Sequence, residues 1–516
     1  MCAPVAVIKG GWRLINVADL ITVNANRYPD CNAVICGDDG RELTWVEFDR
    51  MVNRFSNGLI EMGINKGDRV GIYLPNGPEW LIAFFGTMRI GAIALPFNIL
   101  YKTGEISYIL NNARAKLVVG AAREVKQNIL NILDDIPSVK NIVTLGEPVE
   151  GAVDFCSVIS KNSDILEKLD CAEDDVAAML YTSGTTGRPK GVMLSHKNFM
   201  TKAALNSDAL LLNEQDLFMT ATPYCHIFIT VTLLGPFYTG AAVLSMSRFN
   251  PEKALELLAR YRVTHFAGVP TMYIYMMNFY SPEKYDLSAW RYKQTAGYSM
   301  PPGLFNKIER TFGPGLCEYY GSTETSATVT YNRLGHSKTG SIGLAAPGYS
   351  LKVADEDGNE LPAGEVGEIL VKGPGIFKGY WEMPEATEEA FKDGYFRTGD
   401  LGYRDEDGYF YIVDRKKDLI LCGGYNVYPR EVEGIIYQHP KILECAVLGK
   451  DDPDRGEVPE AYVVLRRGEI LTEEELISFC KQRMASYKVP RFIYFIKEMP
   501  KNSTGKIMKW HLKERF

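Results

Sequence analysis

Short apolar segments that alternate with helical segments constrain the fold of this chain more than any other feature of its sequence. Four of them read RVGIYLP, AIALPF, KLVVG and NIVTLG, at residues 69–75, 92–97, 116–120 and 141–146. Each is short and apolar at consecutive positions, which is typical of a strand buried on both faces. Strands that alternate with helices predict α/β layers around a mainly parallel sheet.

The segment TWVEFDRMVNRFSNGLIEMG, residues 44–63, predicts one of these helices. Thr44 and Glu47 have the spacing of a capping box, in which each side chain satisfies a backbone N–H at the helix start. Apolar side chains then recur on a single helical face at Phe48, Met51, Val52, Phe55 and Leu59.

Residues 80–100, WLIAFFGTMRIGAIALPFNIL, imitate a membrane span. Arg89 lies in the middle of this stretch, and a charge at the centre of a bilayer is costly. Gly86 and Gly91 flank it, and Pro96 follows. We therefore expect a buried helix that leads into a strand, and no transmembrane segment.

The pattern of the sequence changes near residue 338 and again near residue 414. Residues 338–414 consist of short strands separated by turn signals, which predicts a β-rich subdomain. The segment DEDG occurs twice there, at 355–358 and 405–408. Neither copy has the ligand spacing of an EF-hand, so both are interpreted as hairpin turns.

Helices and strands alternate again from residue 415 to the end of the chain. We therefore expect two domains within an α/β fold class. The large N-terminal domain, residues 1–414, consists of layered α/β subdomains plus the β-rich subdomain. A small C-terminal α+β domain covers residues 415–516.

The composition is that of a soluble globular protein, and it excludes several classes of function. The chain has 516 residues, of which 46% are hydrophobic, and a net charge of -7, which argues against nucleic acid as the main partner. The ten cysteines and six histidines are scattered, so neither a disulfide framework nor a zinc site is expected. The N-terminus lacks the apolar core of a signal peptide, which favours a cytoplasmic location. Composition leaves an oligomer possible.

The segment YTSGTTGRPKG, residues 181–191, is rich in the groups that bind phosphate. Glycines allow backbone N–H groups to approach an anion, and hydroxyls and Lys190 add donors and charge. The spacing does not match the Walker A loop, because a glycine follows the lysine. A surface turn without function remains the alternative from spacing alone.

The longer segment YTSGTTGRPKGVMLSH resembles the phosphate-binding signature of the adenylate-forming superfamily, in particular its acyl-CoA synthetase branch. Further signatures follow in the family's order. They are YYGSTET at 319–325, YFRTGDLG at 395–402, DRKKDLILCGGYNVYPREVE at 414–433 and PKNSTGKIMK at 500–509. One such motif would be weak evidence, but together they span most of the chain.

The resemblance implies an AMP-forming acid–CoA ligase. A carboxylate attacks the α-phosphate of ATP, pyrophosphate leaves, and the thiol of coenzyme A then displaces AMP from the acyl-adenylate. ATP, Mg²⁺ and coenzyme A are the implied cofactor and substrates, with a small carboxylic acid as the remaining partner. Transfer to a separate carrier-protein thiol is the close alternative, and the end of the chain soon after residue 509 argues against a fused carrier. Two more distant alternatives are a nucleotide-binding regulator without catalysis and a P-loop kinase or ATPase.

The resemblance also implies roles for individual residues around the nucleotide. Tyr320 would stack on adenine, Thr323 would contact the α-phosphate, and Glu324 would hold Mg²⁺. Asp400 would accept both ribose hydroxyls, with Arg415 close to the ribose. The remaining residues expected at the nucleotide are Thr182, Ser183, Gly184, Thr185, Thr186, Gly187, Lys190, Gly297, Tyr298, Glu318, Tyr319 and Gly321.

The C-terminal signatures imply a domain that serves the two half-reactions in turn. Lys506 would bridge the carboxylate and the α-phosphate during adenylation. A rotation about a hinge near 414–417, centred on Lys417, would then bring Gly423, Gly424 and Tyr425 to the site, where they would form a tunnel for the pantetheine arm of coenzyme A.

The resemblance also implies residues that line the acyl pocket. His226 matches the position near the acyl carboxylate in many members of the family, although a core histidine is the alternative. No aspartate stands in TPYCHIF to pair with an amino group, which argues against an amino-acid substrate. Tyr298 stands where a small alanine is usual, which favours a compact aromatic, alicyclic or short-to-medium-chain acid over a long-chain acid. The residues expected to line the pocket are Tyr224, His226, Phe228, Gly268, Val269, Ala296, Gly297, Tyr298 and Ser322.

Overall fold

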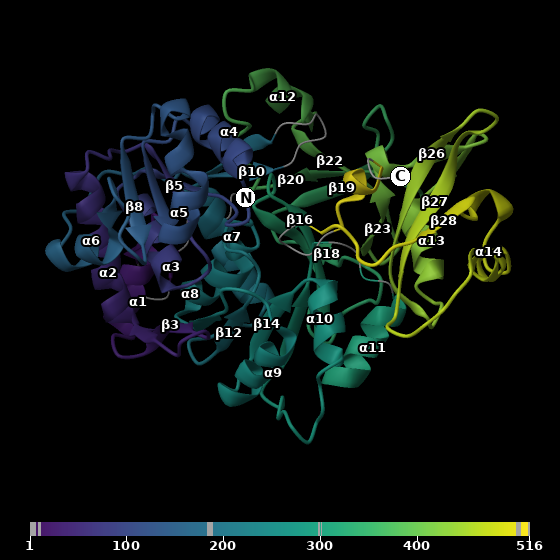
Figure 1. The fold of residues 1–516 in the computed structure, drawn as a ribbon, viewed down its shortest axis with the longest axis horizontal. Helices are drawn as coiled ribbons and strands as arrows, with labels where there is room; N and C mark the ends of the chain where they lie inside the picture. Colours follow the sequence, from purple (N-terminus) through teal and green to yellow (C-terminus); the bar gives the residue numbers. More distant parts are fainter. Residues whose placement is uncertain are drawn as a thin grey trace.

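The computed structural model describes residues 7–8, 12–182, 189–297, 300, 302–501 and 507–513. The N-terminal sheet lies at the left of Figure 1. In spatial order its strands are β11 (Lys190–Ser195), β10 (Val176–Thr182), β6 (Ile93–Pro96), β5 (Arg69–Tyr73), β7 (Leu117–Ala121), β8 (Asn141–Leu145) and β9 (Val153–Asp154). Every pairing except that of β10 with β11 is parallel, as the sequence predicts.

Helices cover both faces of this sheet. One core packs α4 (Thr103–Ala113), α5 (Ala122–Asn128) and the 3₁₀ helix η1 (Leu130–Asp135) on one face. The other face packs against α2 (Trp45–Glu61), α3 (Pro78–Arg89) and α6 (Phe155–Lys161). The predicted capping box at Thr44 and Glu47 starts α2.

The stretch 80–100 forms a buried helix that leads into a strand, as predicted. Helix α3 ends at Arg89 and β6 begins at Ile93. The Arg89 guanidinium lies 2.9 Å from the Asp49 carboxylate, which compensates its buried charge. Among the described residues, no helix is both long and apolar enough to span a bilayer.

A second, longer sheet runs beneath the centre of the molecule in Figure 1. Its order is β18 (Leu344–Ala345), β17 (Ala327–Tyr331), β16 (Leu316–Ser322), β15 (Tyr292–Thr295), β14 (His265–Gly268), β12 (Leu217–Thr220), β13 (Ala242–Ser245), β3 (Asn32–Cys36) and β4 (Glu42–Thr44). The run from β16 to β3 is parallel, so the carboxyl ends of these strands meet at one edge.

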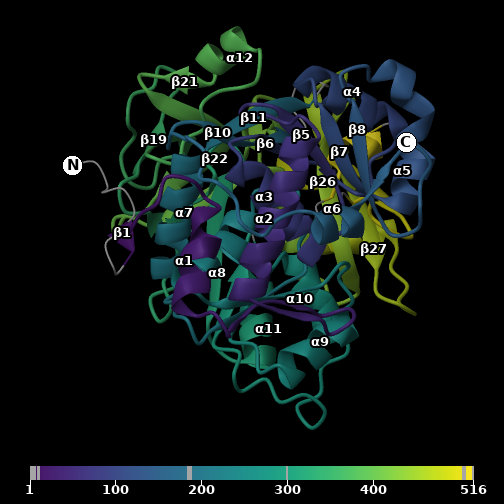
Figure 2. The same cartoon turned by 90° about the vertical axis from the view of Figure 1, so that its left-hand side faces the viewer.

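Different helices cover the two faces of the second sheet. Helices α9 (Pro251–Arg260), α10 (Pro270–Met277) and α11 (Pro302–Phe312) pack on one face, at the bottom of Figure 1. The other face joins the main core with α1 (Asp19–Arg27), α7 (His196–Ala209), α8 (Gly235–Thr239) and the π-helix η2 (Thr230–Leu234). Figure 2 shows this stack from the side, with α1, α2 and α8 toward the viewer.

The predicted β-rich subdomain forms a third sheet. It contains β19 (Ser350–Ala354), β20 (Gly367–Lys372), β21 (Phe391–Lys392), β22 (Tyr395–Arg404) and β23 (Phe410–Arg415), with α12 (Pro384–Glu389) beside it. Both DEDG segments are turns, as predicted: the N–H of Gly358 donates to the carbonyl of Asp355, and that of Gly408 donates to the carbonyl of Asp405.

The C-terminal part has its own sheet and its own core. Its elements are the 3₁₀ helix η3 (Lys416–Asp418), β24 (Ile420–Cys422), β25 (Tyr425–Val427), α13 (Pro429–Ile436), β26 (Ile442–Asp452), β27 (Gly456–Leu465), α14 (Glu473–Lys481), the 3₁₀ helix η4 (Ser486–Lys488), β28 (Phe492–Phe495) and α15 (Lys509–Lys513). Far from it, β1 (Val7–Ile8) pairs with β2 (Trp12–Arg13). The boundary predicted between 414 and 415 falls within β23, and the first strand of the C-terminal sheet begins at Ile420.

Candidate active site

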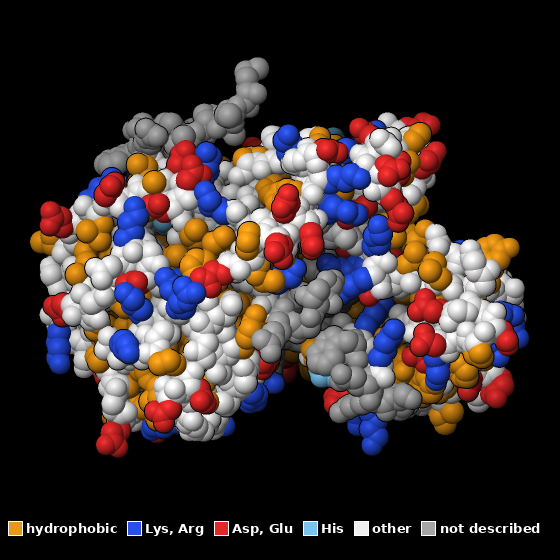
Figure 3. All heavy atoms as spheres, turned by 90° about the horizontal axis from the view of Figure 1, so that it is seen from above, with side chains coloured by type: hydrophobic (Ala, Val, Ile, Leu, Met, Phe, Trp, Pro, Cys, Tyr) orange, Lys and Arg blue, Asp and Glu red, His pale blue; other side chains and the backbone are white. Residues whose placement is uncertain are grey.

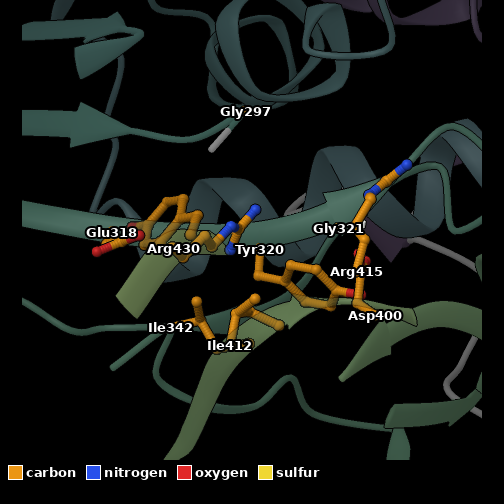
Figure 4. Close-up of a pocket in the computed structure, with 10 residues that line it drawn as sticks. Gly297, Glu318, Tyr320, Gly321, Ile342, Asp400, Ile412, Arg415 and Arg430 are labelled. Atoms are coloured by element: carbon orange, nitrogen blue, oxygen red, sulfur yellow. Dashed lines mark hydrogen bonds and ion pairs between the residues drawn. The ribbon is translucent and has the colours of Figure 1, made fainter. Parts of the chain in front are cut away.

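A pocket lies where the carboxyl edge of the second sheet meets the β-rich subdomain and the C-terminal part (Figure 4). Strand β16, the segment after β15, strands β22 and β23, and helix α13 all contribute to it. The lining residues are Gly297, Glu318, Tyr319, Tyr320, Gly321, Ile342, Asp400, Ile412, Arg415 and Arg430. Seven of these are nucleotide-site residues of the sequence prediction, and the structure brings them together.

Asp400 lines this pocket at one end, and Figure 4 shows Tyr320 and Arg415 beside it. The Tyr320 hydroxyl donates to Oδ2 of Asp400 at 2.6 Å, and Nε of Arg415 lies 3.0 Å from Oδ1. The register of β22 with β23 sets Asp400 opposite Arg415. The buried Asp400 carboxylate raises the pKa of Arg415, and burial raises the pKa of Tyr320. The arrangement therefore fixes the Asp400 carboxyl group between a phenol hydroxyl and a guanidinium.

Glu318 lies deeper in the same pocket and is only 3% exposed. Its Oε1 accepts a hydrogen bond from the backbone N–H of Met300 at 3.1 Å. Burial raises the pKa of this carboxyl to about 8. Glu318 is therefore largely protonated at neutral pH.

Glu324 is connected to the start of β11 through Tyr380. The Tyr380 hydroxyl donates to Oε1 of Glu324 at 3.1 Å, and Nζ of Lys190 lies 4.8 Å from the centre of the Tyr380 ring. This chain of contacts brings together the ends of two motifs that lie far apart in the sequence. Tyr380 is a residue that the sequence analysis missed.

Thr323 and Glu324 lie in a tight turn between β16 and β17. The N–H of Ser326 donates to the carbonyl of Thr323, and both Ser326 and Ala327 have positive φ angles of 55° and 80°. Non-glycine residues in this region store strain, which is common at functional sites. Thr323 itself is buried at 8% exposure.

The residues predicted for the acyl pocket lie around the same sheet edge but in different settings. Tyr224 is buried against Trp80, whereas His226 is exposed and accepts a hydrogen bond from the N–H of Phe228 through Nδ1. The alternative of a core histidine is therefore wrong for His226. Phe228 is buried, Gly268 ends β14, Val269 precedes α10, Ala296 follows β15 and Ser322 ends β16.

Several predicted residues lie outside the described part of the chain. They are Ser183, Gly184, Thr185, Thr186, Gly187, Tyr298 and Lys506. Their flanks are described: Thr182 is the last residue of β10 and Lys190 is the first residue of β11.

The segment predicted to receive coenzyme A forms a hairpin on the surface of the C-terminal part. Gly423 and Gly424 connect β24 to β25 with φ angles of 58° and 84°, which a two-residue type I′ turn requires. Tyr425 is exposed and stacks on Tyr487. Lys417, the predicted hinge residue, is exposed in η3 between β23 and β24.

Arg430 and Asp414 also belong to the site region and were missed. The backbone N–H of Arg430 donates to Oδ2 of the buried Asp414 at 2.9 Å, and this bond fixes the start of α13 beside the pocket. Both residues fall inside the quoted DRKKDLILCGGYNVYPREVE motif, but that motif alone gives no indication of which side chains face the nucleotide pocket.

Figure 3 shows Lys and Arg side chains gathered near the centre of this face of the molecule, which suits polyanionic ligands.

A pocket at the carboxyl edge of a parallel sheet, with an anchored carboxylate beside an aromatic ring, defines a nucleotide-binding α/β protein. Comparison with known proteins gives the family. The family described as AMP-binding enzyme matches residues 21–381, and that described as AMP-binding enzyme C-terminal domain matches residues 431–506. The chain belongs to this family, in the acyl-CoA synthetase branch of the adenylate-forming superfamily.

Three relatives illustrate the similarity. A long-chain-fatty-acid–CoA ligase of Bacillus subtilis (strain 168) is 35% identical over 526 residues, which cover 96% of this chain and 93% of the relative. The anthranilate CoA ligase AuaEII in complex with anthranoyl-AMP is 31% identical with a TM-score of 0.91, covering 97% of this chain and 96% of that one. ATP-bound MatB from Rhodopseudomonas palustris is 33% identical with a TM-score of 0.89, covering 97% and 98%, whereas its apo structure gives a TM-score of 0.78.

Proposed function

We propose that this chain is an AMP-forming acid–CoA ligase. In the first half-reaction, a carboxylate oxygen of the acid bonds to the α-phosphorus of ATP and the bond to the β-phosphate bridging oxygen breaks, which releases pyrophosphate. In the second, the sulfur of coenzyme A bonds to the acyl carbon, the thiol proton is lost, and AMP leaves with the bonding electron pair. The observation that carries the proposal is the Asp400 site in a member of this family.

Asp400 is the residue that we assign to the two ribose hydroxyls. A carboxylate can accept from both hydroxyls of a vicinal diol, and the Asp400 oxygens already face a phenol and a guanidinium that hold the side chain in place. Tyr320, which lines the same pocket, is the residue that we assign to adenine stacking. Positioning of this kind accounts for much of the catalysis in phosphoryl and nucleotidyl transfer.

The Glu324 carboxylate is a suitable ligand for Mg²⁺. Phosphate oxygens and water would supply the other ligands of the ion. Among the described residues, no group of three or more His, Cys, Asp or Glu side chains is placed to bind a metal ion. A single protein carboxylate is typical where substrate phosphates supply most ligands of Mg²⁺. When bound, the ion would neutralise charge on the phosphates. Tyr380 orients the Glu324 carboxylate through its hydroxyl.

Lys506 is the residue that we propose for charge stabilisation during adenylation. The test is the exchange of labelled pyrophosphate into ATP in the presence of an acid, compared between the wild type, Lys506→Ala and the control Lys513→Ala, which removes an exposed lysine of α15. We expect exchange to fall at least about 100-fold in Lys506→Ala, because a positioned charge at a reacting centre contributes roughly that much, and to be unchanged in the control. Wild-type exchange in Lys506→Ala would refute the mechanism.

The acid that we propose is compact: aromatic, alicyclic or short-to-medium chain. Its support is the bulk of Tyr298 in the sequence at a position that adjoins Gly297 of the pocket. A screen of coenzyme A-dependent AMP release over benzoic, cyclic, branched and straight-chain acids tests this. Strong preference for long straight chains would overturn the substrate class and leave the reaction type intact.

A further inference from the structure

The side chain of Gln294, in β15, is buried without a hydrogen bond. None of its surface is exposed, and within the described part of the chain neither Oε1 nor Nε2 has a partner. An unpaired buried polar group costs about 1–3 kcal/mol. Folded proteins seldom retain such a group without a use.

The position of Gln294 in the sheet points to that use. In the register it lies between Ala267 of β14 and Cys317 of β16, and both neighbours belong to the main core, on the face opposite α9, α10 and α11. Neither neighbouring side chain is a strong hydrogen-bond partner for the Gln294 amide, because Ala267 has only a methyl group and the thiol of Cys317 forms weak hydrogen bonds.

A path of small residues leads from Gln294 to the nucleotide pocket. Side chains two positions apart in a strand share a face, so Ala296 follows Gln294 on that face, and Ala296 packs partly buried against the same core. The next residue, Gly297, lines the pocket. At roughly 3.3 Å per residue, Gln294 lies roughly 10 Å below the edge at which the carboxylate of the acid would react.

The side chains that lie in register with Gln294 across the sheet include polar groups but no charged ones. The register row that contains it reads Ser245, Thr220, Ala267, Gln294 and Cys317 across five strands. The hydroxyls of Ser245 and Tyr224 are also buried, and they lie close to each other. An ionised substituent would meet no opposite charge in this row, and an uncompensated buried charge is strongly unfavourable.

We propose that Gln294 binds an uncharged hydroxyl group of the acid, at the end of the molecule far from the reacting carboxylate. A hydroxyl both donates and accepts, and the primary amide of Gln294 offers an acceptor and two donors in return. The inference rests on the proposed ligase activity and narrows its substrate class to hydroxylated compact acids.

The test compares acids that differ only in this hydroxyl. Suitable pairs are para-hydroxyphenylpropanoic against phenylpropanoic acid, and omega-hydroxyoctanoic against octanoic acid, with kcat/KM for AMP release as the readout. We expect the wild type to prefer the hydroxylated member of at least one pair by about 10- to 100-fold, because the apolar analogue leaves the amide unpaired. Gln294→Leu, which keeps the volume and removes the amide, should abolish or reverse this preference by raising activity on the apolar acid.

Ser138→Ala is the matched control. The Ser138 hydroxyl is also buried and unpaired, but it lies beside the N-terminal sheet, between η1 and β8. The control should keep the wild-type ratio. The inference would be overturned if the wild type showed equal kcat/KM for both acids of each pair or preferred the apolar acid. It would also be overturned if Gln294→Leu kept the wild-type ratio of the two kcat/KM values. Either result would leave the proposed ligase activity intact. Absence of AMP release with every acid would instead overturn the proposed function, and the inference with it.

Discussion

Asp400 shows how a single buried carboxylate can define a ligand site. Asp400→Asn keeps the size of the side chain and removes the charge that faces Arg415. A hydrogen bond to a charged group contributes about 1.5–3 kcal/mol, so we expect the KM for ATP to rise about 10- to 100-fold. The measurement is steady-state kinetics with ATP varied. Asp393→Asn, an exposed site in the same subdomain with a φ of 51° that asparagine tolerates, should leave KM unchanged.

Glu318 predicts a pH dependence of stability. Its folded-state pKa is raised to about 8, from an ordinary value near 4.5, because the carboxyl is buried. The folded protein therefore binds more protons than the unfolded chain between these values, and the free energy of unfolding falls as the pH rises through that range. The melting temperature of the wild type should fall by a few degrees between pH 5 and 9, whereas that of Glu318→Gln should not, because a pKa difference of this size corresponds to roughly several kcal/mol in a chain of this length. Parallel pH curves for the two proteins would contradict the prediction, and the exposed Glu389→Gln serves as the control.

The β24–β25 hairpin is the element at which we expect a substitution to separate the two half-reactions. A Cβ on Gly424 would meet nothing within 4 Å in this structure, so Gly424→Ala costs only the strain of its positive φ, about 1 kcal/mol. If the hairpin closes around pantetheine, the added methyl group should slow thioester formation at least about 10-fold while pyrophosphate exchange stays within about twofold.

A second glycine provides the control for this hairpin. Gly408→Ala has the same kind of positive φ, at +87°, in a turn of the β-rich subdomain, and the new Cβ makes ordinary contact with Leu344. It should lower stability by a similar amount and change neither half-reaction. Equal losses in both half-reactions of Gly424→Ala would show that the hairpin acts only through stability.

The sequence predicts the elements of this fold better than the contacts between them. Buried parallel strands are recognisable because both of their faces must be apolar, as in β5 and β7. The Asp400 site is different, because it depends on the register of β22 with β23 and on Tyr320, which lies 80 positions away. Tyr380 and Gln294 were missed for the same reason: their roles follow from tertiary neighbours that no local periodicity encodes.

At the scale of the whole molecule, we expect the orientation of the C-terminal part to decide which half-reaction the site performs. Lys501, at the start of the PKNSTGKIMK motif, donates to the hydroxyl of Tyr275 on α10 at 3.0 Å and also forms an ion pair with Glu444. The first contact joins the C-terminal part to the N-terminal domain, and the second stays within the C-terminal part. The glycine hairpin meanwhile remains exposed. The TM-score with MatB is likewise higher for its ATP-bound structure, 0.89, than for its apo structure, 0.78.

Tyr275→Phe should therefore shift the balance between the two orientations. It removes one hydrogen bond that joins the C-terminal part to the N-terminal domain in the described orientation, and the loss of about 1 kcal/mol corresponds to a factor of roughly 5 in population. We expect pyrophosphate exchange to fall by up to that factor, while the rate at which coenzyme A consumes a chemically prepared acyl-adenylate is unchanged or higher. Tyr261→Phe, on the same helical layer, should affect neither rate. If Tyr275→Phe slowed both half-reactions equally, the contact would be structural, and the orientation would be set elsewhere, with the hinge at Lys417 as the next residue to substitute.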